Sequence, residues 1–259
     1  MSEPAVEVRD VTKRFRRYGP AARHTTLKTA LVSWLSGRRD GIPGVDRFDA
    51  LHGVSFTLAR GTTLGVIGRN GAGKSTLLRL LAGIYQPDAG RVAVRGRVAA
   101  LIELGAGFHP DFTGRENVLI NGIILGLSRR EVRERFDRIV SFAGVEEFID
   151  APLRTWSSGM MLRLGFSIAV HVEPDVLLID EVIAVGDEAF QARCREVIER
   201  RTRSGDRITV IASHDLLAVE ALCKRVLVLD PPHAELFDRP AEGIEHYRRL
   251  SAAPPPASS

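Results

Sequence analysis

The stretch Gly68-Arg-Asn-Gly-Ala-Gly73-Lys74-Ser75 matches the pattern G-x-x-x-x-G-K-[ST], and it directly follows the short apolar run Thr63–Ile67. The apolar run predicts a buried strand, and a helix is expected to begin near Lys74. Between them, glycines allow the backbone N–H groups to turn inward around phosphate oxygens, and the helix N-terminus adds its positive dipole end. The stretch therefore predicts a phosphate-binding loop in an α/β protein.

The roles of individual residues in this loop can be predicted. The Lys74 ammonium is expected to reach the β- and γ-phosphates of a nucleotide, and the Ser75 hydroxyl is expected to bind Mg²⁺. The other nucleotide contacts are expected at Gly68, Asn70, Gly71, Gly73 and Thr76. Mg²⁺ and a nucleoside triphosphate are the cofactors that these assignments predict.

A second apolar run, Val176–Ile179, ends in two carboxylates, Asp180 and Glu181. Ligands of an open α/β sheet bind at the C-terminal ends of its strands. Asp180 is therefore predicted to hold the metal with Ser75. Glu181 is predicted to orient or deprotonate the water that attacks the γ-phosphate. Together with the loop, the pair predicts a hydrolase acting on a nucleotide.

Short β-branched runs alternate with helical stretches along much of the chain, which favours a mostly parallel sheet covered by helices. Val6–Val11 and Ser55–Leu58 are predicted as early strands. Ile208–Ala212 and Val226–Leu229 are continuous apolar runs, as is typical of strands that are buried on both faces.

Residues 103–172 read as almost wholly helical and predict a helical subdomain inserted into the α/β body. Thr113–Glu116 and Ser128–Glu131 have the spacing of capping boxes, which start helices. The predicted division is a first part of the core at 1–102, the helical subdomain, a second part of the core at 173–250 and a proline-rich tail at 251–259.

Residues 16–49 read as an insertion, with glycine and proline at both ends. Within it, Leu27, Leu31, Trp34 and Leu35 form the stripe of a short amphipathic helix, which either packs on its own domain or faces a partner. Much of the basic excess lies between Lys13 and Arg47. It is either a solvated face or a surface for anionic lipid headgroups.

Composition excludes several classes of protein. The chain of 259 residues carries a net charge of +4 and is 44% apolar, as expected for a globular domain. No apolar run approaches the roughly 18–20 residues of a membrane-spanning helix. The basic residues do not alternate with aromatic residues in the pattern typical of nucleic-acid-binding surfaces, so no nucleic-acid partner is expected. Cys194 and Cys223 lack metal-site spacing and are predicted to be buried, reduced thiols.

Three further motifs resemble those of a known protein family. Trp156-Ser157-Ser158-Gly159-Met160 resembles the signature motif of ABC ATPases, usually L-S-G-G-Q. Ser213-His214-Asp215 resembles their switch-histidine motif, and Ala184-Val185-Gly186-Asp187 lies where their D-loop belongs. With the phosphate loop and Asp180-Glu181, these motifs follow one another in the family's order, and the resemblance runs from about Val6 to Arg249.

The resemblance implies a P-loop NTPase core of the ABC type with a parallel sheet, an N-terminal antiparallel β-subdomain and an inserted helical subdomain. It implies ATP as the nucleotide and two cassettes packed head to tail as a homodimer. Ser158 and Gly159 of one copy would then cap the γ-phosphate held by the other. His214 would contact that phosphate and act with Glu181 and Lys74 in catalysis, while Asp187 would link the two sites.

The resemblance leaves two functional residues unassigned. The family places an aromatic residue after the first strand to stack on adenine, for which Phe15 and then Tyr18 are the candidates. The family also carries a glutamine on the loop that enters the helical subdomain. This chain has glutamine only at Gln86 and Gln191, and Glu103 is the candidate that takes its place.

The segments Leu104–Pro110 and Gly114–Asn117 are similar to those of ATPase subunits that export lipid-linked polysaccharides such as O-antigen, capsule-like glycans and teichoic acids. The resemblance implies a short form that lacks the C-terminal glycan-binding domain. It also implies a peripheral protein on the cytoplasmic face of the inner membrane, docked on two copies of an integral-membrane permease. Residues 108–112 and the 16–49 insertion are the expected contacts with that permease. The alternatives are an exporter motor for a lipid, drug or peptide, or a soluble ABC ATPase.

Overall fold

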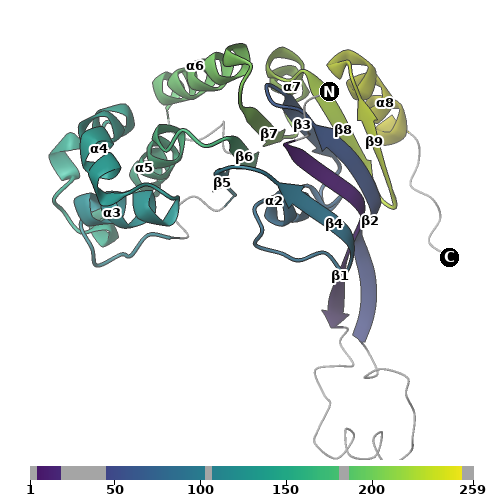
Figure 1. The fold of residues 1–259 in the computed structure, drawn as a ribbon, viewed down its shortest axis with the longest axis horizontal. Coiled ribbons are helices and arrows are strands. Elements are labelled where there is room, and N and C mark those ends of the chain that lie inside the picture. The colour runs from purple at the N-terminus through teal and green to yellow at the C-terminus, as the bar shows by residue number, and fades with distance from the viewer. Residues whose placement is uncertain (1–4, 19–44, 103–106, 181–186, 253–259) are drawn as a thin grey trace, which may run out of the picture.

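The computed structural model describes residues 5–18, 45–102, 107–180 and 187–252. Their elements, shown in Figure 1, are β1 (Val6–Tyr18), β2 (Val45–Leu58), β3 (Thr63–Gly68), α2 (Lys74–Leu81), β4 (Ala89–Val94), β5 (Val98–Leu101), α3 (Gly114–Ile124), α4 (Arg129–Ala143), short 3₁₀ turns at Glu146–Phe148 and Leu153–Thr155, α5 (Ser158–His171), β6 (Val176–Asp180), α6 (Glu188–Ser204), β7 (Ile208–Ala212), α7 (Leu216–Leu222), β8 (Arg225–Asp230), β9 (His233–Phe237) and α8 (Pro240–Ala252).

The described strands form two sheets. The larger has the order β5-β6-β7-β3-β8-β9, in which all neighbours are parallel except the β8–β9 pair. The smaller sheet, β2-β1-β4, is antiparallel. This arrangement agrees with the expected core, because the strands that alternate with helices are parallel and the N-terminal strands are not.

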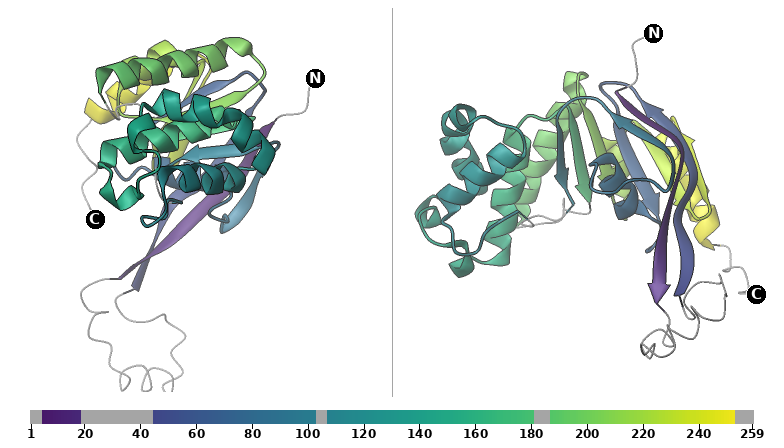
Figure 2. Two further views of the ribbon diagram at one scale, coloured as in Figure 1. Left: turned by 90° about the vertical axis from the view of Figure 1, so that its left-hand side faces the viewer. Right: turned by 60° about the horizontal axis from the view of Figure 1, so that its bottom comes forward.

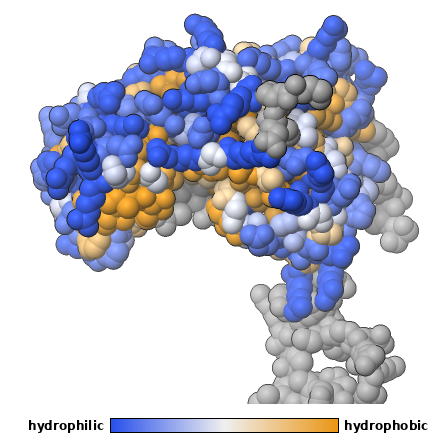
Figure 3. Space-filling view, in the orientation of Figure 1, coloured by the Kyte–Doolittle hydropathy of each residue, from blue (hydrophilic) through white to orange (hydrophobic). Residues whose placement is uncertain are grey.

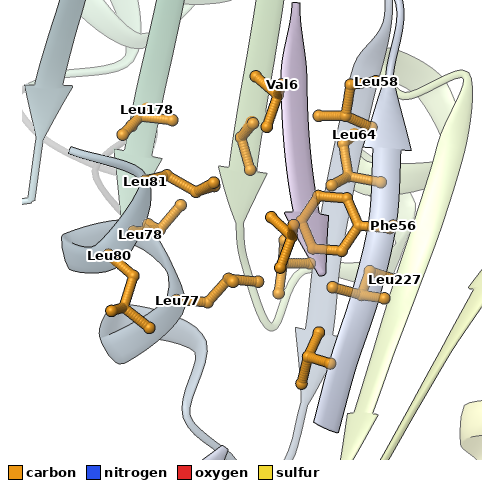
Figure 4. Packing of buried hydrophobic residues seen from close by; sticks show 14 of the residues in the cluster. Val6, Phe56, Leu58, Leu64, Leu77, Leu78, Leu80, Leu81, Leu178 and Leu227 are labelled. Carbon is orange, nitrogen blue, oxygen red and sulfur yellow. The ribbon is translucent and has the colours of Figure 1, made fainter. Parts of the chain in front are cut away.

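Helix α2 lies between the two sheets, and its leucines join both in one hydrophobic core. Figure 4 shows Leu77, Leu78 and Leu81 facing Val6 and Leu58 of the small sheet and Leu64, Leu178 and Leu227 of the large one. All of these side chains are at most 2% exposed. The phosphate loop at the start of α2 is therefore held by a core that packs against the whole length of the helix.

The helical subdomain has a separate hydrophobic core. Residues of α3, α4 and α5 contribute to it, among them Val118, Ile139 and Leu164. Both predicted capping boxes are formed, at Thr113 with Glu116 and at Ser128 with Glu131. Helix α5 also packs against the large sheet through Phe166 and Ala169, and Phe142 of α4 contacts the same core cluster, so both helices join the subdomain to the core. Figure 1 shows the subdomain at one end of the molecule and the small sheet at the other.

The N-terminal strands differ from their predicted lengths. β1 extends to Tyr18 and β2 begins at Val45, and the two pair as far as Tyr18 opposite Val45. Residues 16–18 and 45–49 are thus strands of a long hairpin, visible in Figure 2, so the predicted insertion at 16–49 begins within β1 and ends within β2. The many charged residues at both ends of this segment obscure the alternation of apolar and polar side chains from which a strand is predicted. The Leu27–Leu35 stripe lies outside the described residues.

Three strands were missed by the sequence prediction: β4, β5 and β9. β5 has only four residues, and β9 alternates small, charged and apolar side chains at the edge of the sheet. The two cysteines agree with expectation, since both are buried in the core. Burial raises the pKa of each thiol to about 12, so both remain protonated and unreactive. Among the described residues, no helix is long and apolar enough to cross a membrane.

Candidate nucleotide-binding site

The phosphate loop connects the fully buried strand β3 to α2, and its glycines are required by close backbone contacts. A Cβ at Gly68 would lie 2.5 Å from the carbonyl oxygen of Leu229. At Gly73, φ is +95°, and a Cβ would lie 2.4 Å from the carbonyl oxygen of Ala50. Because side chains cannot occupy these positions without moving the backbone, the loop keeps its N–H groups accessible at the start of α2.

Lys74 is buried, with only 7% of its surface exposed. Its ammonium donates to the carbonyl oxygens of Gly68, at 2.9 Å, and Arg69, at 3.3 Å. Both partners are neutral carbonyls of the loop itself, so these bonds leave the positive charge of the ammonium uncompensated. A buried cation at a helix N-terminus suits an anion, and the triphosphate of a nucleotide fits this charge.

An open pocket of about 550 Å³ brings together most of the phosphate-loop residues that the sequence singled out, although Gly68 is not among its lining residues. Its lining contains the predicted residues Phe15, Asn70, Gly71, Gly73, Lys74, Ser75, Thr76 and Asp180, and also Phe48 and Ala50. The volume is in the range of small-molecule sites. Phe15, the loop and Asp180 come from β1, the β3–α2 connection and β6, so the fold brings together residues that are far apart in the sequence.

Ser75 and Asp180 supply the oxygen atoms that Mg²⁺ prefers. Both line the pocket that also contains Lys74, and Asp180 lies at the C-terminal end of β6, as predicted. A bound Mg²⁺ would neutralise phosphate charge at this place. The donor set and the position of both residues fit the metal. Glu181, the predicted base, lies outside the described residues.

His214 lies just beyond the end of β7, the strand that pairs with β6 so that Ala212 is opposite Asp180. The loop is fixed on both sides of the histidine. The Ser213 hydroxyl accepts a hydrogen bond from the Asp215 N–H at 3.0 Å, and Asp215 caps α7. His214 itself is exposed and is not among the residues that line the pocket. Its contact with the γ-phosphate stays a prediction.

The signature segment is held away from this pocket. Ser157 caps α5 by accepting a hydrogen bond from the Met160 N–H, and the first turn contains Ser158, which is exposed, and Gly159, which is half-buried. Trp156 is buried against α3, where a Cβ at Gly114 would lie 2.6 Å from its ring. Neither Ser158 nor Gly159 lines the pocket, so this chain does not bring its own signature to its phosphate loop.

Asp187 has partners within its own chain. Its carboxylate accepts a hydrogen bond from the Phe190 N–H at 2.8 Å, which caps α6. The second oxygen lies 3.7 Å from a guanidinium nitrogen of Arg163 on α5. Arg163 was not predicted, because no sequence motif marks it. In this chain Asp187 thus connects α6 to the helix that carries the signature.

The aromatic wall of the pocket is larger than the sequence predicted. Phe15 contributes one ring, as expected, and Phe48 contributes a second. The two are directly paired across β1 and β2, and their ring centroids are 6.0 Å apart. Predicting the hairpin register would have revealed Phe48. The side chain of Tyr18, the other candidate, is not described.

Comparison with known proteins also points to an ATP-binding protein, as the following matches show. The family model described as ABC transporter matches residues 51–184. Over 247 residues the chain is 47% identical to an O-antigen export system ATP-binding protein, RfbB, of Myxococcus xanthus, covering 95% of this chain and 56% of that protein. It is 42% identical to an RfbB of Klebsiella pneumoniae, covering 96% of this chain and 100% of the relative.

A third relative, the teichoic acids export ATP-binding protein TagH of Levilactobacillus brevis, is 38% identical, with 95% of this chain and 65% of the relative covered. Among solved structures, the ATP-binding subunit of an ABC transporter superposes with a TM-score of 0.70 at 20% identity, covering 96% of this chain and 95% of that one. The fold, the matched motifs and the full-length relative show that the chain belongs to the ABC transporter family, among its ATP-binding proteins.

Proposed function

We propose that the chain is the ATP-hydrolysing subunit of an exporter that drives lipid-linked polysaccharide across the cytoplasmic membrane. The cargo class is O-antigen, capsule-like glycan or teichoic acid. The observation that carries the proposal is the 42% identity along the whole length of a relative named for O-antigen export. The similarity to a relative named for teichoic acids export supports the broader cargo class.

The residues of the pocket suit hydrolysis of ATP. Lys74 and the loop N–H groups would bind the phosphates, and Ser75 and Asp180 would hold Mg²⁺. Glu181, next along the chain from Asp180, would take the proton of the attacking water. His214, at the end of the neighbouring strand, would reach the γ-phosphate.

A homodimer would complete this site. Ser158 is exposed and Gly159 half-buried at the start of α5, and neither lines the pocket of its own chain, so a second copy could reach this helix N-terminus. A helix N-terminus attracts anions, so the signature of one copy suits the γ-phosphate bound by the other. Loss of that phosphate on hydrolysis would remove the bridging charge and let the two copies separate.

The membrane partner would be a permease, in two copies, docked on a groove between α3, α5 and the core. The groove has a volume of about 300 Å³ and is lined mainly by apolar residues, among them Ile84, Phe108 and Ile124. Ile84 is 60% exposed and Ile124 67%. Figure 3 shows hydrophobic side chains gathered on the helical subdomain toward the core. Such an exposed apolar groove suits a partner helix.

Of the predicted docking residues 108–112, Phe108 lines this groove. Phe112 does not line it and stacks on His109 instead, with ring centroids 4.2 Å apart. The Arg16–Asp49 segment, the second predicted contact, is described only at its two ends. Ile124 is therefore a better probe of docking than Phe112.

Replacing Ile124 and Phe108 by alanine is expected to weaken association with the permease by about 5- to 100-fold, the usual cost of truncating buried apolar anchors. Basal ATP hydrolysis should stay unchanged, because neither residue lines the nucleotide pocket. Co-purification from native membranes measures the association. Phe148→Ala is the control, since this phenylalanine is 49% exposed in the same subdomain but outside the groove. Equal recovery of the permease with all variants would contradict docking at this groove.

The cargo can be tested in inside-out vesicles that contain the chain and the permease that purifies with it. Lipid-linked glycan should enter the vesicle lumen only when ATP is added. ATP-dependent entry of a drug, peptide or other lipid, with the glycan excluded, would instead establish the alternative exporter. A chain that hydrolyses ATP but purifies with no membrane protein would favour a soluble ABC ATPase.

A further inference from the structure

Phe48 stands out among the residues of the nucleotide pocket because it is a large apolar side chain with 48% of its surface exposed. It lies on β2, far in sequence from the phosphate loop, and no motif includes it. Aromatic surface that is exposed at the wall of a pocket is stabilised when a ligand covers it.

The hairpin places Phe48 beside Phe15. The two residues are directly opposite in the antiparallel register of β1 and β2, so their side chains lie on the same face of the hairpin. Their ring centroids are 6.0 Å apart, and the ring planes are tilted by 34°. The neighbouring pair, Arg14 and Asp49, forms an ion pair at 3.0 Å.

Phe15 also contacts Tyr85 and Lys13. The ring of Tyr85 meets it edge-on, with centroids 5.6 Å apart, and the Lys13 ammonium lies 5.6 Å from its centroid. Lys13 is held in turn by the Gln86 carbonyl oxygen, at 2.8 Å, and by the Asp88 carboxylate, at 3.1 Å. The Phe15 ring is thus held in place by Tyr85 and Lys13 while it lines the pocket. Phe48 adds a second aromatic ring to that lining.

We propose that Phe48 is a second nucleobase-contacting residue, so that the base of ATP rests on a wall of two rings rather than on Phe15 alone. The inference rests on the nucleotide site of the proposed function and is independent of the cargo. Stacking uses the face of the base and tolerates any base, in contrast to hydrogen bonds to its edge. The wall should therefore add affinity for ATP and GTP alike and none for phosphate groups.

Phe48→Ala is expected to raise the dissociation constant of Mg-ATP and of Mg-GTP by about 5- to 30-fold, as for the loss of one aromatic contact to a base. The affinity for Mg-tripolyphosphate, which has no base, should stay that of the parent protein. Phe48→Trp should bind ATP at least as well as the parent. Isothermal titration of the full chain with each probe measures these values.

Phe148→Ala is the matched control, because Phe148 has the same exposure and lies in the helical subdomain. It should bind all three probes like the parent. Phe48→Ala with unchanged ATP affinity would overturn the inference, as would an equal loss for tripolyphosphate, which would mean that the hairpin only supports the loop. Failure of the parent protein itself to bind ATP would overturn the proposed function as well.

Discussion

Glu181→Gln is expected to slow ATP hydrolysis by about 10²- to 10⁴-fold, the usual contribution of a positioned general base. Binding of Mg-ATP should remain, because the phosphates are bound by Lys74 and the loop N–H groups. With the γ-phosphate retained, the variant should accumulate as closed dimers in the presence of ATP. Steady-state phosphate release and size-exclusion chromatography with ATP measure the two effects.

The control for this variant is Glu188→Gln, which removes the same charge from the exposed first residue of α6. It should hydrolyse ATP at the rate of the parent protein. Turnover of Glu181→Gln at the parent rate would show that another group activates the water. A monomeric Glu181→Gln variant that binds ATP would contradict the head-to-tail dimer instead.

Lys74→Ala is expected to fail earlier, at binding, with an affinity for ATP lower by on the order of 10²- to 10³-fold. The reason is the loss of charge-assisted hydrogen bonds to the phosphates at a buried position. Its hydrogen bonds to Gly68 and Arg69 would be lost too, so the loop would also be less well ordered. The measurement is the shift of the melting temperature on addition of Mg-ATP, which should nearly vanish.

Lys224→Ala is a matched control. This lysine also donates to two backbone carbonyl oxygens, those of Gly61 at 2.8 Å and Thr202 at 3.3 Å, but it does not line the pocket. It can lower the melting temperature of the protein without ATP, while the shift caused by ATP should persist. A normal ATP-induced shift in Lys74→Ala would contradict the assignment of Lys74 to the phosphates.

The strand, turn and helix of the predicted phosphate loop could be read from the sequence because their geometry is local. The glycine positions, Lys74 and Ser75 are consecutive, and their backbone conformation follows from residue type. Asp180 was predictable for a related reason, since a fully apolar run that ends in a carboxylate places that group at the end of a buried strand. The helical subdomain was equally evident from its two capping boxes.

Pairing between distant segments was not predictable in the same way. Phe48 joins the pocket through the register of a hairpin whose strands are mostly polar, and Arg163 meets Asp187 through the packing of α5 against α6. The groove that contains Ile84 and Ile124 also exists only when the helical subdomain is placed against the core. Each of these features depends on tertiary contacts that hydrophobic periodicity does not encode.

The most direct test of the proposed export function is made in the native host, with Glu181→Gln in place of the parent chain. Cells are fractionated, and surface polysaccharide is compared with the lipid-linked polysaccharide inside. The proposal predicts that a surface glycan is lost while its lipid-linked precursor accumulates on the cytosolic side. An unchanged set of surface glycans, in cells where ATP hydrolysis by this chain is abolished, would contradict polysaccharide export.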